Sequence, residues 1–191
     1  MGEVKKKRLK KAALVLVVCI VFIGLGTFGG IQYVTGAGNV KHDSNETILP
    51  SQESSLSALV IYQPGRSEFS KDIAYNLAKG LNDTGYEVTI NYPGEFLPSD
   101  LGNYDIVALG TTVYNGNFSP VLGDYVSGIK NLDNSKVLIY STGMMTDNTS
   151  ELDGLSKLLY RKADYQEKFY SNEQETEVTR AYEFGSSLGK P

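Results

Sequence analysis

The chain has 191 residues and a formal net charge of −4; residues 1–11 contribute six Lys or Arg against one Glu, and the remainder 12 against 21. Because nucleic-acid binding needs cations clustered on the folded part of a protein, an acidic domain behind a basic stub argues against a nucleic-acid partner. The single cysteine, Cys19, excludes an internal disulfide, and one cysteine with one histidine cannot build a Cys/His-rich metal site. A histidine-based triad is not expected either, because the single histidine, His42, precedes the predicted folded domain.

Residues 12–34 form an uncharged, apolar segment, AALVLVVCIVFIGLGTFGGIQYV. As a helix rising about 1.5 Å per residue it would span roughly 34 Å, against roughly 30 Å of bilayer hydrocarbon. The segment therefore predicts a single transmembrane helix. The cations of residues 1–11 favour a cytoplasmic stub, with the rest of the chain on the extracytoplasmic side. A cleavable signal peptide is the alternative, since the small residues at 35–38 would permit cleavage.

Small and polar residues dominate the stretch 35–57, which shows no sustained apolar period. This composition predicts a flexible linker between the membrane helix and a folded domain at residues 58–191. His42 lies in the linker and is interpreted as a solvated side chain rather than a ligand or a base.

The domain alternates strands and helices. A short continuous apolar run predicts a strand buried on both faces at residues 58–62, and the largely apolar segments 105–110 and 136–140 predict two more buried strands. An alternating pattern predicts a strand near a sheet edge at 86–92, and a weaker pattern predicts a last strand at 167–170. Helices are expected at residues 73–81, 120–129, 152–161 and 177–188.

This order predicts an α/β fold in which a mainly parallel sheet is covered by helices on both faces. Such sheets bind ligands beyond the carboxyl ends of their strands, near the point where the strand order reverses. The three buried strands end at loops that begin with Gln63, Gly110 and Ser141. A binding site is therefore expected where these loops meet.

The stretch 58–143, and more loosely the chain as far as residue 190, resembles the flavodoxin-like family. The most specific pattern is YDIVALGTTVYNGNFSP, which is similar to the family loop G-[ST]-x-x-Y-x-G-x-x-x-P. The segments ALVIYQPGRSEFSKDIAYNLAKGL and KVLIYSTG add a strand–turn–helix unit and a second strand–loop unit. The resemblance implies a doubly wound, five-stranded parallel sheet in the order 2-1-3-4-5, and binding of flavin mononucleotide (FMN).

The resemblance also implies the positions that contact FMN. The phosphate loop corresponds to Gly65, Arg66, Ser67 and Ser70, although Glu68 and Phe69 depart from the family pattern. A plain helix N-cap at Ser67 is the alternative interpretation. The isoalloxazine ring would lie against two loops that contain Thr111, Thr112, Tyr114, Asn115 and Gly116, and Ser141, Thr142 and Gly143.

The resemblance implies a membrane-tethered, FMN-binding electron-transfer domain whose partner is a redox protein or a quinone. No catalytic side chain and no metal site are predicted, because the flavin would supply the electron chemistry. Two alternatives remain. The degraded phosphate loop is compatible with a flavodoxin-fold binding or interaction module that has lost FMN, and some relatives of the family are FMN-dependent quinone oxidoreductases.

Overall fold

The computed structural model describes residues 14–25, 27, 36, 40–51, 55–144 and 148–190. The chain divides into two compact units, Met1–Gly36 and Ala37–Pro191. The predicted basic stub at residues 1–11 lies outside the described residues, as do parts of the predicted membrane helix and linker.

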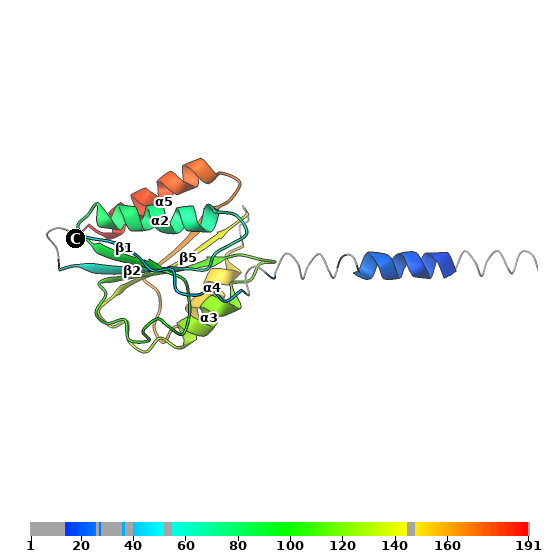
Figure 1. Cartoon of the computed structure of the whole chain (residues 1–191), viewed down its shortest axis with the longest axis horizontal. Helices are drawn as coiled ribbons and strands as arrows, with labels where there is room; N and C mark the ends of the chain where they lie inside the picture. The colour runs from blue at the N-terminus through cyan, green and yellow to red at the C-terminus, as the bar shows by residue number, and fades with distance from the viewer. Residues whose placement is uncertain are drawn as a thin grey trace, which may run out of the picture. The chain divides into compact units, whose positions relative to one another are not determined.

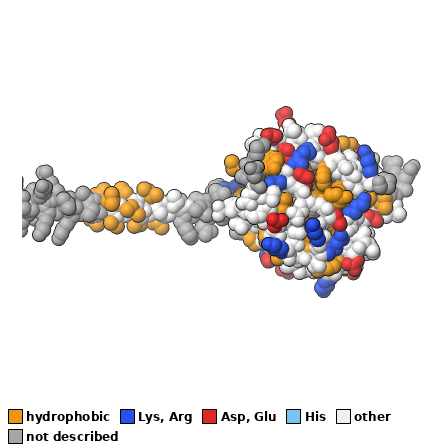
Figure 2. All heavy atoms as spheres, turned by 180° about the vertical axis from the view of Figure 1, so that it is seen from behind, with side chains coloured by type: hydrophobic (Ala, Val, Ile, Leu, Met, Phe, Trp, Pro, Cys, Tyr) orange, Lys and Arg blue, Asp and Glu red, His pale blue; other side chains and the backbone are white. Residues whose placement is uncertain are grey.

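In the first unit, residues 14–25 are helical. The large apolar side chains of this helix are exposed, from 45% at Val18 to 70% at Phe22, and apolar side chains cover the visible face of this segment in Figure 2. Within the described ranges, no helix combines the length and the apolar character needed to cross a membrane.

The second unit is a six-stranded sheet between two layers of helices, with α2 and α5 on one face and α3 and α4 on the other (Figure 1). The strands are β1 (Thr47–Leu49), β2 (Ser57–Tyr62), β3 (Glu87–Asn91), β4 (Ile106–Thr112), β5 (Lys136–Gly143) and β6 (Tyr165–Tyr170). The helices are α2 (Phe69–Asn82), α3 (Pro120–Ser127), α4 (Ser150–Ser156) and α5 (Gln174–Leu188). The structure thus confirms the α/β class, while α4 ends at Ser156 rather than at residue 161.

The prediction of five strands in the order 2-1-3-4-5 is wrong for the sheet as a whole. The sheet has six strands in the order β1-β3-β2-β4-β5-β6. The strands β2 to β6 pair in parallel, and the additional strand β1 pairs antiparallel with β3, aligning Ile48 with Thr89. A three-residue strand in a polar segment is too short to show an alternating pattern of its own. Its pairing and register are set by the partner strand instead.

Part of the predicted linker at residues 35–57 is folded. β1 (Thr47–Leu49) lies within it, and residues 40–51 belong to the same compact unit as the predicted domain. The backbone N–H of Asn45 donates to Asn91 Oδ1 at 2.9 Å, and Thr47 Oγ1 lies 3.0 Å from the hydroxyl of Tyr75. The carbonyl of Val40 accepts from Gln63 Nε2 at 3.0 Å. Residues 40–51 are therefore attached to the sheet and to α2.

Two apolar layers hold the sheet between its helices. Along β2, Ala58, Val60 and Tyr62 pack toward α2 and α5, whereas Leu59 and Ile61 pack toward α3 and α4. All five are at most 2% exposed. A continuous apolar run suits this position because neighbouring residues of a strand face opposite sides, and each large side chain so buried contributes roughly 1.5–3 kcal/mol.

Helices α2 and α5 approach so closely that only glycine fits at the contact. A Cβ at Gly185 would lie 2.2 Å from the carbonyl oxygen of Leu77, and one at Gly80 would lie 2.2 Å from the carbonyl oxygen of Tyr182. The two glycines let the backbones touch, which fixes the position of α2 and of the loop that precedes it.

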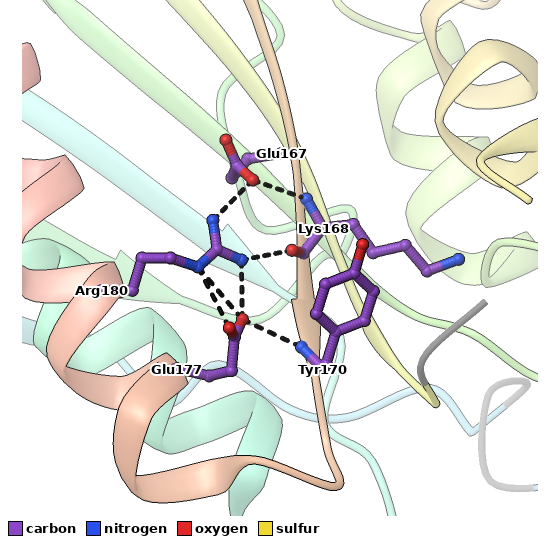
Figure 3. Close-up of polar contacts among 5 residues, drawn as sticks. All are labelled: Glu167, Lys168, Tyr170, Glu177 and Arg180. Atoms are coloured by element: carbon purple, nitrogen blue, oxygen red, sulfur yellow. Dashed lines mark hydrogen bonds and ion pairs between the residues drawn. The ribbon is translucent and has the colours of Figure 1, made fainter. Parts of the chain in front are cut away.

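Side chains of α5 close the outer edge of β6 (Figure 3). Arg180 donates to the backbone carbonyl of Lys168 and to Glu167 Oε1, the latter at 2.6 Å. Glu177 Oε2 accepts from Arg180 at 2.6 Å and from the backbone N–H of Tyr170 at 3.0 Å. The network satisfies backbone groups that would otherwise present an open strand edge to another chain.

Candidate functional site at the carboxyl ends of the strands

The loops after β2, β4 and β5 start side by side. The parallel register aligns Tyr62 with Gly110, Gly110 with Tyr140, and Thr112 with Thr142. Because these strands end at the same edge of the sheet, the loops that follow them meet there. The predicted convergence of the three strand ends is thus present. Gly110 and Ser141 lie within β4 and β5, however, and the loops begin after Thr112 and Gly143.

The loop after β2 leads into the N-terminus of α2. The N–H of Gly65 donates to Ser70 Oγ at 2.9 Å, and Ser70 is only 4% exposed. The helix begins at Phe69 with Glu68 at the N-cap position, so the alternative in which Ser67 is the N-cap is wrong. Glu68 accepts from Lys71 Nζ at 3.0 Å, and this pairing raises the pKa of Lys71. Ser67 is exposed at the helix start, where first-turn N–H groups have no intrahelical acceptor.

The loop after β4 forms a tight hairpin turn. Tyr114 and Asn117 exchange backbone hydrogen bonds of 3.2 and 3.1 Å, and the two residues between them, Asn115 and Gly116, have φ values of 53° and 73°. Two consecutive positive φ values define a type I′ turn, for which Asn-Gly is the favoured sequence. The hydroxyl of Tyr114 accepts from the N–H of Arg66 at 3.1 Å, which joins this hairpin to the loop after β2.

Threonine hydroxyls connect the three strand ends. Thr112 Oγ1 donates to the carbonyl of Gln63 at 3.0 Å, and Thr142 Oγ1 lies 3.4 Å from Thr112 Oγ1. A Cβ at Gly65 would lie 3.2 Å from two atoms of Thr112, so a glycine allows close approach of these loops. Thr111 points inward instead, since its hydroxyl accepts from the N–H of Ser119 at 2.8 Å and the residue is 1% exposed.

Ser141 is turned away from the loop junction. Its hydroxyl donates to Glu151 Oε1 at 2.9 Å, and the residue is fully buried. The same carboxylate oxygen pairs with Lys168 Nζ at 2.8 Å, in an ion pair whose side chains are at most 5% exposed. The Ser141 side chain therefore belongs to an internal charged cluster rather than to a surface that a ligand could contact. Gly143 ends the strand, and a Cβ added there would lie 3.1 Å from the Cβ of Val113.

The structure therefore brings part of the predicted set together. Direct hydrogen bonds or close contacts link the three loops through Gly65, Arg66, Thr112, Tyr114 and Thr142. Asn115 and Gly116 lie exposed at the tip of the hairpin, next to Tyr114.

Gln63 is a polar residue of this junction that the sequence marked only as the start of a loop. It is fully buried, its Nε2 donates to the carbonyl of Val40, and its Oε1 has no hydrogen-bond partner within the described part of the chain. Its backbone N–H donates to the carbonyl of Gly110 at 3.0 Å. In the sequence, the only sign that Gln63 is buried at this junction was its position directly after an apolar strand.

Comparisons with known proteins show which solved structures share this fold. No family model and no curated protein matches the chain. Among solved structures, a flavodoxin from Streptococcus pneumonia TIGR4 is 19% identical, with a TM-score of 0.58, over 70% of this chain and 97% of the other. Oxidised flavodoxin 2 from Bacillus cereus is 18% identical, with a TM-score of 0.53, over 68% of this chain and 94% of the other.

A third similar structure is an NAD(P)H:quinone oxidoreductase from Methanothermobacter marburgensis. It is 14% identical, with a TM-score of 0.50, over 71% of this chain and 100% of the other. At these identities the similarity is one of fold, and it covers nearly the whole length of each of the three proteins. The chain therefore has the flavodoxin-like fold.

Proposed function

We propose that the second unit binds FMN across the carboxyl ends of β2, β4 and β5 and transfers electrons, tethered to a membrane by the N-terminal segment. The observation that carries the proposal is the contact between the loops after β2 and β4, made by the Arg66 N–H and the Tyr114 hydroxyl at 3.1 Å. In a flavodoxin-like fold, these are the loops at which a flavin phosphate and ring would lie side by side.

The start of α2 supports an anion site. The exposed Arg66 supplies a cation, Ser67 supplies a hydroxyl, and the first-turn N–H groups point out of the helix end. Glu68 and Asp72 place two carboxylates near the same helix end and oppose a phosphate there. The Glu68 charge is partly compensated by Lys71 at 3.0 Å. The residues thus fit a phosphate group. The helix end would attract the phosphate less strongly than it would if the two carboxylates were absent.

The hairpin after β4 supports a site for a flat ring. Tyr114 is half-buried and offers an aromatic face, and Thr112 and the turn at Asn115 and Gly116 offer polar groups beside it. FMN, when bound, supplies the one- or two-electron chemistry. The protein side chains would bind and orient it, and the acidic surface would attract a basic redox partner.

Binding of FMN to the purified full chain tests the proposal. We expect added FMN to lose fluorescence as it binds, and the retained complex to show flavin absorption after gel filtration. Arg66→Ala and Tyr114→Ala should each weaken binding, whereas Glu183→Gln, which removes an exposed charge on α5, should not. A chain that leaves FMN fluorescence unchanged at micromolar concentrations of both components would contradict the proposal.

A second candidate is a flavodoxin-fold module that has lost FMN. The N–H groups of Gly65 and Arg66 already donate to Ser70 Oγ and to the Tyr114 hydroxyl. Such internal acceptors compete with a phosphate for the same donors. If the altered phosphate loop is the reason that the chain does not bind FMN, replacing Glu68 with glycine and Phe69 with threonine should create FMN binding that the native chain lacks.

A third candidate is an FMN-dependent quinone oxidoreductase. The similarity of fold to a protein named NAD(P)H:quinone oxidoreductase favours it. Turnover of NAD(P)H with a quinone by the FMN-loaded chain would distinguish an enzyme from a passive electron carrier.

The membrane tether is the remaining part of the proposal. The uncharged stretch 12–34 and the exposed apolar side chains of the helix at residues 14–25 support it. We expect the chain to stay in the membrane fraction after alkaline carbonate extraction. Protease added to intact cells should remove the domain if it lies on the extracytoplasmic side.

A further inference from the structure

A groove of about 620 Å³ lies apart from the residues assigned to FMN. Its walls are residues 41–43, the loop at residues 93–99 after β3, and one side of α3. None of the twelve residues predicted to contact FMN lines it. Its volume falls within the range of roughly 300–1,000 Å³ that is typical of small-molecule sites.

The groove exists because the connection from β3 to β4 contains no helix. Residues 92–105 instead run as a loop alongside α3. The loop is fixed in place, since the hydroxyl of Tyr125 donates to the carbonyl of Pro98 at 3.0 Å and the N–H of Lys130 donates to the carbonyl of Ser99 at 2.8 Å. This wall is therefore formed before any ligand binds.

The N-terminal wall is also fixed. The ring of His42 packs on that of Tyr92 with centroids 5.2 Å apart, and the Asn45 N–H donates to Asn91 Oδ1 at 2.9 Å. Lys41 Nζ lies 3.7 Å from Glu95 Oε1, which joins this wall to the loop after β3.

The surface inside the groove is largely apolar and aromatic. The ring of Phe96 packs on Gly94, where an added Cβ would lie 2.3 Å from a ring carbon. Phe96 nevertheless remains 45% exposed, so its ring is accessible to a ligand. Leu97, Val121 and Tyr125 complete the apolar lining.

The charges on the lining are unbalanced. The carboxylates are those of Asp43, Glu95 and Asp124, and the cation is Lys41, which pairs with Glu95. Asp43 and Asp124 have no cationic partner in the ranges that the structure describes. A ligand that enters this groove therefore meets aromatic carbon together with uncompensated negative charge.

We propose that the groove binds a small organic cation with an apolar body, of the arylalkylamine class. The apolar part would contact Phe96 and Tyr125, and the ammonium group would lie against Asp43 or Asp124. An aromatic face and a nearby carboxylate both favour an ammonium group. The site is independent of FMN and of the proposed electron transfer.

Binding of two matched probes to the full chain in a non-ionic detergent tests this inference. 4-Phenylbutylamine carries the cation, and 4-phenylbutanol has the same apolar body without it. By isothermal titration we expect the amine to bind more tightly than the alcohol. Asp43→Asn and Asp124→Asn should each weaken amine binding by roughly two- to fivefold, the range for a solvent-accessible ion pair. The charge-matched control Glu183→Gln should leave it unchanged.

Phe96→Ala should weaken both probes by a similar factor, roughly three- to tenfold for a lost aromatic contact. Equal affinity of the amine and the alcohol would overturn the proposal in favour of a neutral apolar ligand. An effect of Glu183→Gln as large as that of Asp43→Asn would also overturn it, because the amine would then respond to the overall charge. The comparison of the two probes on the native chain needs no variant to fold.

Discussion

Replacing Lys168 with methionine removes the cation from a buried ion pair and leaves its partner behind. Lys168 Nζ lies 2.8 Å from Glu151 Oε1, and the two side chains are 5% and 1% exposed. The Ser141 hydroxyl would be the remaining donor to that carboxylate, at 2.9 Å, and Glu151 Oε2 already has no partner among the described residues. Breaking a buried pair in this way typically costs about 3–5 kcal/mol, because a charge is left uncompensated in a dry environment.

A loss of that size is a large part of a typical unfolding free energy of roughly 5–15 kcal/mol. With a urea m-value of about 2 kcal/mol per M, the midpoint should fall by roughly 1.5–2.5 M, measured by circular dichroism. The double variant Lys168→Met with Glu151→Gln should regain part of the loss, since the amide carries no charge and still accepts from Ser141. The reasoning is refuted if Lys168→Met costs less than about 1 kcal/mol, or if the double variant is no more stable than the single one.

Three further predictions concern the core. The fully buried Tyr140 hydroxyl has no partner within the described ranges, so Tyr140→Phe should be neutral or stabilising by about 1 kcal/mol in urea unfolding; a clear loss would reveal an unrecognised partner. Gly185→Ala should destabilise by at least about 1–3 kcal/mol, because its Cβ would lie 2.2 Å from the Leu77 carbonyl; an unchanged midpoint would contradict the close contact of α2 and α5. Burial raises the pKa of Tyr62, Tyr125 and Tyr140 above the usual value of 10.0, so the unfolded chain ionises first. Stability should be complete below about pH 10 and fall above it by roughly 1.4 kcal/mol per pH unit for each such tyrosine, which alkaline unfolding followed by tyrosinate absorbance would measure.

The apolar strands could be predicted because their signal is local. Residues 58–62, 106–109 and 137–140 are continuous apolar runs, and a strand covered by helices on both faces requires that composition. The Asn115-Gly116 sequence also suits the two positive φ values of the turn that the structure shows, although only a loop was predicted there. Helix α4 was predicted too long, since its apolar spacing continues past Ser156, where the chain turns toward β6.

The features that the sequence could not reveal depend on partners distant in the chain. β1 is a strand because β3 presents an edge to it, and a segment of three residues has no period of its own. Ser141 follows an apolar run in the sequence, as the predicted site residues do, but it lies within β5 and its hydroxyl donates inward to Glu151 of the buried Lys168–Glu151 pair.

The sequence by itself determined the order of the elements, the apolar layers and the uncharged N-terminal stretch, since each follows from the composition of consecutive residues. The tertiary structure alone decided which loops touch, which hydroxyls lie at the junction of the loops and where a groove remains, because hydrogen bonds and packing join residues far apart in the chain. Thr112 and Thr142 illustrate the difference: both follow apolar strands in the sequence, and only the parallel register of β4 and β5 brings their hydroxyls within 3.4 Å.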